Sequence, residues 1–323
     1  MNDLLKRIDR IAYYKEMLAF VTRVGRAYLT RNFRRPRSHY NGTSILPKSE
    51  GEPLICDAVE TNRPLMVGRF GSTEMQTTNH YLRCQFGLAR DYSAGIYDII
   101  CRCSGVFPAR RNVLDRFCEV YLESLTHVDI LAAWNFIDIE GFLVKHLAPQ
   151  ARLVSLSCLG VIKEAPRPWS ACLSGKRVLV VHPFRDSILR QYEKRALLFK
   201  NPLRLPEFRD LTVIKAVQSL GGNSDFHDWH EALQCMKNEM DRATYDIALI
   251  GAGAYGFPLA AHVKSRGKQA IHVGGALQML FGIYGGRWED NPEFKNMINE
   301  HWIRPAEQER PANFKNVENG CYW

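Results

Sequence analysis

Residues 177–187 read RVLVVHPFRDS, and residues 247–256 and 270–278 read IALIGAGAYG and AIHVGGALQ. Each stretch begins with a short run of aliphatic residues, which is typical of a strand buried on both faces. Each run passes at once into glycine, histidine or polar residues, and a helical pattern follows. This alternation predicts an α/β protein, Rossmann-like, with a largely parallel sheet and helices on both faces.

The same alternation extends in both directions along the chain. We expect strands at 65–67, 128–132, 153–156, 177–181, 211–216, 247–250 and 270–273. We expect helices at 74–85, 97–103, 111–125, 187–199, 229–242, 259–265 and 276–281. Residues 41–290 then form one α/β domain. The polar, proline-interrupted residues 291–323 are expected to be a C-terminal extension that wraps around it.

Residues 1–40 form a separate basic segment. They hold ten Lys or Arg against three acidic residues, a net of +7 out of the formal +9. Apolar positions in 3–29 recur with a period near 3.6, which predicts an amphipathic helix that ends in the basic linker 31–37. The helix either lies on an anionic membrane surface or packs on the domain or on a partner chain. The rest of the chain, residues 41–323, is nearly neutral, and this argues against nucleic acid as a partner.

The composition narrows the class of protein. With 46% hydrophobic and 24% charged residues, the 323-residue chain resembles an ordinary soluble globular protein. No apolar run is long enough to span a membrane, and charges interrupt every candidate signal-peptide core. Nine cysteines without a CxxC pair or zinc-type spacing predict reduced thiols in a cytoplasmic protein. The P-loop, nucleophile-elbow and HExxH motifs are absent, so those three mechanisms are unsupported.

Polar and glycine residues gather where four predicted strands end, which is where ligands bind in such sheets. The first cluster is GRFGSTE at 68–74. Gly71 permits a tight turn, Ser72 can cap the helix, and Glu74 lies in its first turn, as a capping carboxylate or a catalytic one. Arg69 directly follows a buried strand, and its fork suits a phosphate.

The second cluster follows the strand at 177–181. His182 and Arg185 lie in the turn, and Gln191 and Arg195 follow on the next helix. A spacing of four places Gln191 and Arg195 on one helix face, which could face the same pocket as Arg185. The alternative for Arg195 is an ordinary solvated helix charge.

The third cluster is a literal GxGxxG that follows a strand and opens a helix. It contributes four candidate ligand-binding residues, Gly251, Gly253, Tyr255 and Gly256. An NAD site would need an acidic residue about 20 positions on, and residues 247–288 contain no Asp or Glu. An NAD-dependent enzyme is therefore only a minor alternative. The turn is better suited to present backbone amides to an anion at a helix N-terminus.

The fourth cluster follows the last predicted strand. It comprises His272, Gly274, Gly275 and Gln278, and further on Arg287, which precedes a tryptophan. Two glycine pairs allow close backbone approach, the guanidinium suits a phosphate, and the indole offers a face for a ring. The plainer interpretation of the last pair is a core tryptophan beside a capping arginine. Together the four clusters predict a site for a polyanionic ligand that carries a ring.

The first motif, residues 69–74, combined with the late glycine turn and the strand end at 272–275, resembles the glycosyltransferases of the GT-D fold. The resemblance covers roughly residues 50–290, and the second half is similar to a branch found with bacterial polysaccharide synthesis. It implies transfer of a sugar from a nucleoside diphosphate, most of all a UDP-sugar, to a hydroxyl of a glycan or lipid-linked acceptor, as in O-antigen synthesis. Glu74 is implied as the general base or sugar-orienting group. Arg69 and the amides of 251–256 are implied to hold the diphosphate.

The chain departs from this pattern at the metal position. Metal-using members resemble Asp-x-Glu at the end of the motif, whereas this chain has Ser72-Thr73-Glu74. A single carboxylate is a poor Mg²⁺ or Mn²⁺ site, so we expect no metal cofactor. Arg69, Arg185 and Arg287 would neutralise the leaving diphosphate instead. A non-catalytic nucleotide-binding or regulatory protein is the competing class.

Overall fold

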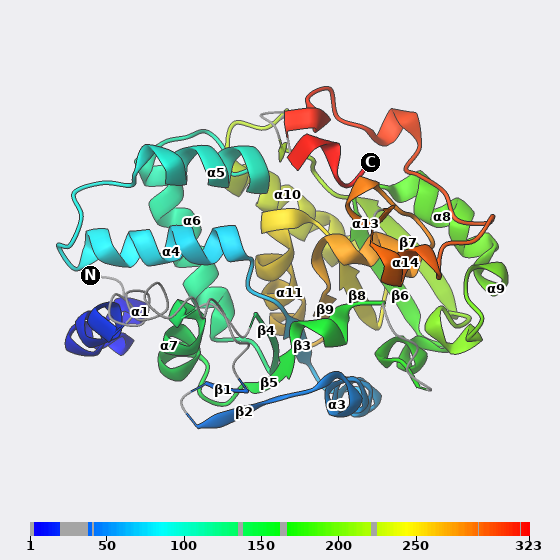
Figure 1. The fold of residues 1–323 in the computed structure, drawn as a ribbon, viewed down its shortest axis with the longest axis horizontal. Coiled ribbons are helices and arrows are strands. Elements are labelled where there is room, and N and C mark those ends of the chain that lie inside the picture. The colour runs from blue at the N-terminus through cyan, green and yellow to red at the C-terminus, as the bar shows by residue number, and fades with distance from the viewer. Residues whose placement is uncertain are drawn as a thin grey trace.

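The structure is a computed structural model that describes residues 3–19, 38–40, 42–134, 138–161, 167–220, 225–289, 291–316 and 318–323. In these ranges a nine-stranded sheet runs in the order β1-β2-β5-β4-β3-β9-β8-β6-β7 (Figure 1). All neighbours pair in parallel except β1 and β2. The strands are β1 (His39–Tyr40), β2 (Thr43–Leu46), β3 (Leu65–Gly68), β4 (Ile130–Ala133), β5 (Arg152–Ser155), β6 (Arg177–His182), β7 (Asp210–Lys215), β8 (Ile247–Ile250) and β9 (Gln269–His272).

Two apolar cores lie on opposite faces of this sheet. Along β6, Leu179 and Val181 belong to one core and Val178 and Val180 to the other, as the period of two requires. Helices of the first core are α4 (Ser72–Gln85), α5 (Ala94–Ser104), α6 (Arg111–Leu125), α7 (Asp138–Leu147), α10 (Trp229–Arg242) and α11 (Gly256–Ser265). Helices of the second are α3 (Lys48–Glu60), α8 (Arg185–Glu193), α9 (Arg195–Leu198), α12 (Leu277–Leu280), α13 (Gly286–Glu289) and α14 (Pro292–Lys295). The predicted fold class is confirmed.

Two local differences from the predicted elements have clear causes. Helix α3 was not expected, because Gly51 and Pro53 interrupt its pattern. Gly51 is needed there, since a Cβ at this position would lie 2.5 Å from the Cys158 sulfur. The predicted helix over 187–199 is two helices, because α8 ends before Lys194 and α9 begins after it.

The N-terminal segment packs on the domain over the part that the structure describes. It comprises α1 (Asp3–Arg7) and a helical stretch over 10–19, so the predicted helix over 3–29 is interrupted at residues 8 and 9. Ile8 and Tyr13 are buried in the first core, and the Tyr13 hydroxyl donates to the Asn79 side chain at 2.6 Å. Ile11 stays 65% exposed. The remainder of the predicted helix and the basic linker lie outside the described residues.

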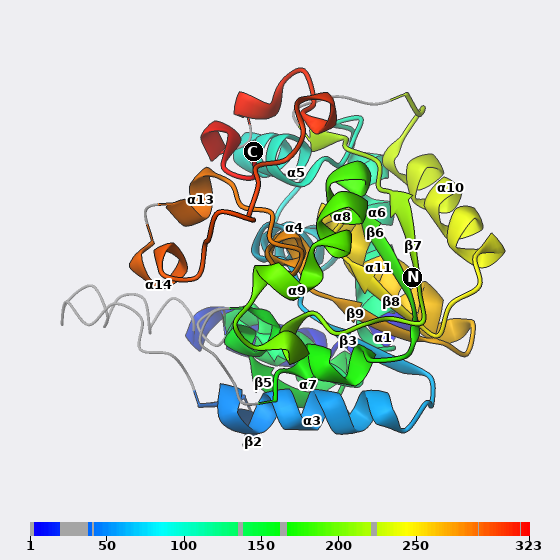
Figure 2. The ribbon, with the colours of Figure 1, turned by 90° about the vertical axis from the view of Figure 1, so that its right-hand side faces the viewer.

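The C-terminal residues run across the second core and reach α5. Trp302 donates its indole N–H to the Leu198 carbonyl at 3.0 Å, and Ile303 pairs with Ile283. Arg102 of α5 donates to the Asn316 carbonyl at 3.3 Å. Figures 1 and 2 both show this last segment, in red, beside α5. The extension therefore forms part of the packed domain near the carboxyl ends of the strands.

Glu309 anchors this extension to α8. Its carboxylate accepts from the backbone N–H groups of Asp186 at 2.8 Å and Ser187 at 3.2 Å, at the N-terminus of that helix. We expect Glu309→Ala to lower the free energy of unfolding by about 1–3 kcal/mol, because these buried donors lose their acceptor. Urea unfolding measures the change. The exposed Glu307→Ala is the matched control, and equal losses in both variants would contradict this assignment.

Candidate functional site

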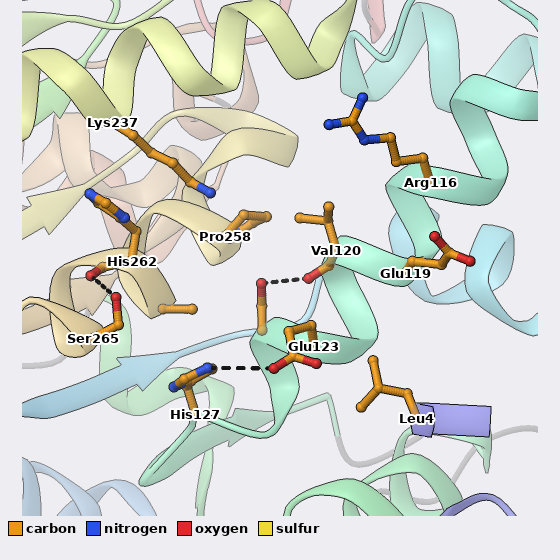
Figure 3. A pocket seen from close by; sticks show the side chains of 12 residues that line it. Leu4, Arg116, Glu119, Val120, Glu123, His127, Lys237, Pro258, His262 and Ser265 are labelled. Carbon is orange, nitrogen blue, oxygen red and sulfur yellow. Dashed lines mark hydrogen bonds and ion pairs between the residues drawn. The ribbon is translucent and has the colours of Figure 1, made fainter. Parts of the chain in front are cut away.

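A cavity of about 440 Å³ lies between α6, α10 and α11, and Figure 3 shows its side chains. It mixes both charges, since Arg116 and Lys237 face it together with Glu119 and Glu123. The pKa of Lys237 is lowered by burial and by the Arg116 charge. Oε1 of Glu123 lies 3.9 Å from Nε2 of His127. This cavity has no glycine turn and contains no residue that the strand-end motifs single out, so it is not the site predicted from the sequence.

The carboxyl edge of the sheet has the geometry of a ligand crevice. The chain leaves β3 into α4 on the first face, and it leaves the adjacent β9 into α12 on the second. The chain after β8, on the other side of β9, also turns to the first face. Connections that depart on opposite faces leave an opening beyond the strand ends, where open α/β sheets bind ligands. One strand-end residue from each of the four motifs lies at this opening, namely Arg69, His182, Gly251 and Gly274.

Arg69, the first residue after β3, is the central cation of this edge. Its Nε is buried and has no hydrogen-bond partner, and its guanidinium carbon lies 5.2 Å from the centre of the Trp134 indole. Gly274, in the left-handed region with φ of 75°, packs so closely that a Cβ would lie 3.1 Å from that carbon. A buried donor left unsatisfied is costly, and an anionic ligand would remove the cost.

Glu74 lies beside Arg69, on the third residue of α4, with its side chain only 8% exposed. The carboxylate folds back over Gly71, where a Cβ would stand 1.8 Å from Oε2. Burial raises the pKa of Glu74, while its own backbone amide, the Ser104 hydroxyl and the Arg69 charge act in the opposite direction. A carboxyl group with a raised pKa beside a cation at a ligand edge is suited to proton transfer.

Two buried histidines line the same edge, and both are neutral near pH 7. Burial lowers the pKa of His182 to about 3. Burial and the Arg69 charge lower the pKa of His272 to about 3. His182 Nδ1 accepts from the Phe184 amide at 3.0 Å, so its Nε2 carries the hydrogen. His272 Nδ1 lies 3.3 Å from the Ile250 carbonyl and donates to it, which leaves Nε2 as an acceptor.

These histidines give a testable pH dependence of stability. Their folded-state pKa lies below the ordinary 6.5, so the unfolded chain binds more protons and stability falls as the pH drops below about 6.5. At pH 5 each histidine is expected to cost about 2 kcal/mol. Urea unfolding between pH 7 and 5 measures this loss of stability. In His182→Gln, the free energy of unfolding should fall less steeply with decreasing pH than in the wild type. The exposed His227→Gln should keep the wild-type slope, and parallel curves for both variants would contradict the assignment.

A small pocket of about 80 Å³, the edge pocket, opens between the ends of β6, β8 and β9. Gly251 allows its walls to approach, since a Cβ there would lie 2.7 Å from the His182 ring. Gly275 does the same for the Tyr322 ring, at 2.5 Å. The lining residues are Cys103, His182, Pro183, Phe184, Gln218, Leu220, Gly251, Gly253, Gly275, Gln278, Tyr322 and Trp323.

Unpaired donors characterise the edge pocket and its neighbour Arg69. The side-chain nitrogens Gln218 Nε2 and Trp323 Nε1 are buried without a hydrogen-bond partner, as is Arg69 Nε. No Asp or Glu occurs among the described lining residues of the pocket. Donors without acceptors suit a ligand that is rich in acceptors, such as a phosphate or a nucleobase carbonyl. The rings of Tyr322 and Trp323 add apolar surface for a ring system.

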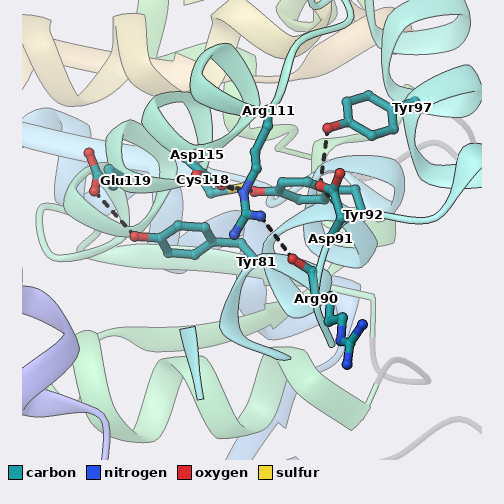
Figure 4. A network of polar contacts seen from close by, with 9 residues as sticks. All are labelled: Tyr81, Arg90, Asp91, Tyr92, Tyr97, Arg111, Asp115, Cys118 and Glu119. Atoms are coloured by element: carbon teal, nitrogen blue, oxygen red, sulfur yellow. Dashed lines mark hydrogen bonds and ion pairs between the residues drawn. The ribbon is translucent and has the colours of Figure 1, made fainter. Parts of the chain in front are cut away.

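Helix α4, which carries Glu74, and the loop before α5, the helix that carries Ser104, are each tied to α6 by a tyrosine hydroxyl. Figure 4 shows Tyr81 of α4 bonded to Glu119 of α6 at 3.2 Å, and Tyr92 bonded to Asp115 at 2.8 Å. Burial raises the pKa of the nearby Cys118 thiol. All nine cysteines are free thiols. This layer gives the Glu74 and Ser104 pair a rigid support.

Several residues singled out by the sequence lie elsewhere. Gln191 is buried beneath the C-terminal extension and donates to the Gly282 and His301 carbonyls, at 3.1 and 2.9 Å. Arg195 pairs with Glu207 at 3.2 Å, and the break at residue 194 removes the continuous helix face that the spacing assumed. Neither residue lines the edge pocket.

The other predicted residues divide between the edge and its supports. Tyr255 is buried against the Trp229 ring and bonded to Ser219 at 2.7 Å. The His272 ring packs where a Gly256 side chain would be, at 2.2 Å from its Cβ position. Arg185 is exposed at the start of α8. Ser72 does not cap α4 as expected, because the N-cap position is Gly71 and Ser72 is the first residue of the helix. Arg287 is exposed and donates to the Tyr322 hydroxyl at 2.8 Å, next to the pocket.

Sequence reasoning missed the tail and loop residues that complete the site. Tyr322 and Trp323 reach it through the fold from the C-terminal segment, and Gln218 from the loop after β7. Trp134, after β4, donates to the Phe70 carbonyl and covers Arg69. Trp134 directly follows a strand, so the rule that selected the four clusters, polar or glycine residues at strand ends, could have been extended to find it.

No metal centre is evident in the described ranges. Within them, no group of three or more His, Cys, Asp or Glu side chains is arranged to hold an ion. Glu74 has Arg69 as its charged neighbour and Ser104 as its hydrogen-bond partner. The residues present therefore do not supply the usual set of oxygen ligands for Mg²⁺ or Mn²⁺. The described helices include none that is long and apolar enough to cross a bilayer.

Comparison with known proteins finds similarity only among solved structures. No protein-family model and no curated protein matches the chain. One similar structure is described as domain of unknown function 1792 with a distinct glycosyltransferase fold, at 12% identity and a TM-score of 0.43, covering 83% of this chain and 92% of that one. Another is described as a new glycosyltransferase with the same domain from Streptococcus sanguinis, at 13% identity and a TM-score of 0.40, covering 84% and 98%. Similarity at this level carries no argument about activity, which depends on the side chains at the strand ends.

Proposed function

We propose that the chain is a glycosyltransferase that moves a sugar from a nucleoside diphosphate to a hydroxyl group of a glycan or lipid-linked acceptor. The observation that carries the proposal is Arg69, whose buried Nε has no hydrogen-bond partner and which lies beside the buried Glu74 carboxyl and against the glycine turn at 274–275. A buried guanidinium with an unsatisfied donor, next to a carboxyl group able to accept a proton, matches the needs of this reaction. The leaving group is an anion, and the attacking hydroxyl must lose a proton.

In this proposal each part of the edge has one role. Glu74 takes the proton from the acceptor hydroxyl, whose oxygen forms the new bond to the anomeric carbon. The bond from that carbon to the phosphate oxygen breaks, and the diphosphate keeps the electron pair. Arg69, with the His182 Nε2–H and the unpaired Gln218 and Trp323 donors, stabilises the charge that develops there. His272 and Gly274 allow the turns after β8 and β9 and the Arg69 side chain to pack closely together.

The edge pocket of about 80 Å³ holds only part of a nucleotide, since ligand pockets are usually several times larger. Tyr322 and Trp323 of the C-terminal segment form one wall of this pocket, and Gln278 donates to the Tyr322 carbonyl at 3.2 Å. We propose that residues 318–323 shift when the nucleotide enters, and that the Tyr322 ring then stacks on the base. Transfer without a metal ion is part of the proposal, with Arg69 in the role of the cation.

A thermal-shift screen against UDP, GDP, CDP, dTDP and NAD tests this proposal. We expect one nucleoside diphosphate to raise the melting temperature equally in EDTA and in Mn²⁺. At a hundredfold excess over Kd, the bound nucleotide should add about 2.7 kcal/mol to the free energy of unfolding. Loss of the shift in EDTA with recovery in Mn²⁺ would overturn metal independence. A shift with NAD alone would favour a dinucleotide enzyme and overturn the assignment.

A non-catalytic nucleotide-binding protein is the second candidate, because the same unpaired donors would bind a ligand without turnover. The burial that raises the pKa of Glu74 favours catalysis, since an inert cap gains nothing from a raised pKa. For the N-terminal segment we propose contact with an anionic membrane at the cytoplasmic face, on the basis of the exposed Ile11 and its basic neighbours. Sedimentation with anionic and neutral vesicles tests that contact.

A further inference from the structure

A second cavity opens at the carboxyl edge, on the other side of the turn at 273–276 from the edge pocket. It has a volume of about 270 Å³ and lies among Arg69, the residues that follow β5, and the start of α12. Val273 and Ala276 line this cavity, whereas Gly275 and Gln278 line the edge pocket. The two hollows are therefore separated by one short turn, and Arg69 packs against Gly274 at its centre.

The walls of this second cavity are almost entirely apolar. Val161, Val273, Met279 and Phe294 are each at most 6% exposed, and they form its sides together with further aliphatic residues. No Asp or Glu occurs among its described lining residues. Among these described lining residues, Arg69 is the single charged one. An apolar wall with one cation selects an amphipathic anion, because each end of such a ligand meets a matching surface.

We infer that this cavity binds the acceptor substrate, and that the acceptor carries an anionic group joined to a hydrocarbon chain. The inference rests on the proposed function, since it assigns the second of the two substrates to the second hollow. The anionic group lies at Arg69, beside the edge where the donor diphosphate ends, and the chain lies along Val161 and Phe294. A volume of 270 Å³ is about nine times that of a water molecule, enough for a phosphate and the first part of an alkyl chain.

This assignment places both substrates within reach of one guanidinium. Arg69 has five N–H donors in a fixed fork, so it can contact an anion on each side of Gly274. Ser157 is exposed at the mouth of the cavity, which leaves a path for the rest of the hydrocarbon chain.

The test uses the full chain and three probes, namely decyl phosphate, inorganic phosphate and decanol, with affinities measured by calorimetry. We expect decyl phosphate to bind at least about tenfold more tightly than either half alone, since each buried methylene adds roughly fourfold. Ser157→Trp should block the mouth and weaken decyl phosphate at least tenfold, with the nucleotide shift unchanged. Ala276→Met should fill the interior of the cavity and weaken decyl phosphate to a similar extent. Ser265 is an exposed serine at the opposite edge of the sheet, so Ser265→Trp should have no effect on this binding.

The outcomes separate this inference from the proposed function. Nucleotide binding without chain-dependent binding of decyl phosphate would overturn the acceptor assignment alone. Binding of decyl phosphate that both mouth and interior variants leave unchanged would also overturn it. Selective binding of decyl phosphate, lost in Ser157→Trp, without binding of any nucleotide would support a site for an amphipathic anion in this cavity, but it would overturn the glycosyltransferase proposal and with it the role of that ligand as acceptor.

Discussion

Arg69→Ala is expected to weaken binding of the nucleoside diphosphate by about 10- to 100-fold, because hydrogen bonds to charged groups contribute about 1.5–3 kcal/mol. Arg69 is the one charged group with an unpaired buried nitrogen between the two hollows of the described edge, whereas Arg287 beside the edge pocket is exposed and already bonded to the Tyr322 hydroxyl. Turnover should fall further, by about 10²–10³, since the developing charge on the leaving group loses its main donor. Calorimetry and initial rates measure the two effects.

The matched control for this variant is Arg266→Ala. Arg266 is 58% exposed at the opposite edge of the sheet and pairs with Asp241 at 3.3 Å. Arg69→Lys should recover binding only in part, because an ammonium group keeps the charge but lacks the planar fork. Equal nucleotide affinity for the wild type and Arg69→Ala would show that the anion lies elsewhere.

Glu74→Gln is expected to reduce turnover by about 10²–10⁴ and to leave nucleotide affinity within about threefold. The amide keeps the size of the side chain and its place under Ser104, but it cannot accept a proton from the acceptor. In the wild type, kcat/KM should fall as the pH drops through the raised pKa of Glu74, because the base must be deprotonated. That acid limb should vanish in the variant.

The control for Glu74→Gln is Glu123→Gln, which changes an exposed carboxylate on α6. A variant that keeps full turnover would show that Glu74 only caps α4. A variant that loses nucleotide affinity as strongly as turnover would place Glu74 in donor binding instead. The comparison therefore separates the catalytic role from both structural and binding roles.

The strand ends could be predicted from the sequence because buried parallel strands have a local signature. The aliphatic runs before His182, Gly251 and His272 are followed directly by turns, and the sheet brings these turns together. Periodicity alone did not reveal α3, whose Gly51 serves a contact with a residue about a hundred positions away. Local patterns record strands well and such distant packing contacts poorly.

The candidate site was predictable only where its residues follow strands. Arg69 and Glu74 occupy the first strand–turn–helix unit, and the structure brings them together. Gln191 was selected by helical spacing, yet its side chain supports the C-terminal extension. Tyr322 and Trp323 come from a tail with no periodic pattern, so only the folded chain shows that they cover the edge pocket.

The most direct test of the central claim is the release of nucleotide from UDP-, GDP-, CMP- and dTDP-linked sugars, followed with purified protein and an amphipathic acceptor. CMP-sugars serve as the donor class that lacks a diphosphate. We predict release from one nucleoside-diphosphate sugar, abolished by both Arg69→Ala and Glu74→Gln and unchanged in Arg266→Ala. Nucleotide binding with no release above the Glu74→Gln blank, for any donor, would contradict the account and favour a protein that binds nucleotides without catalysis.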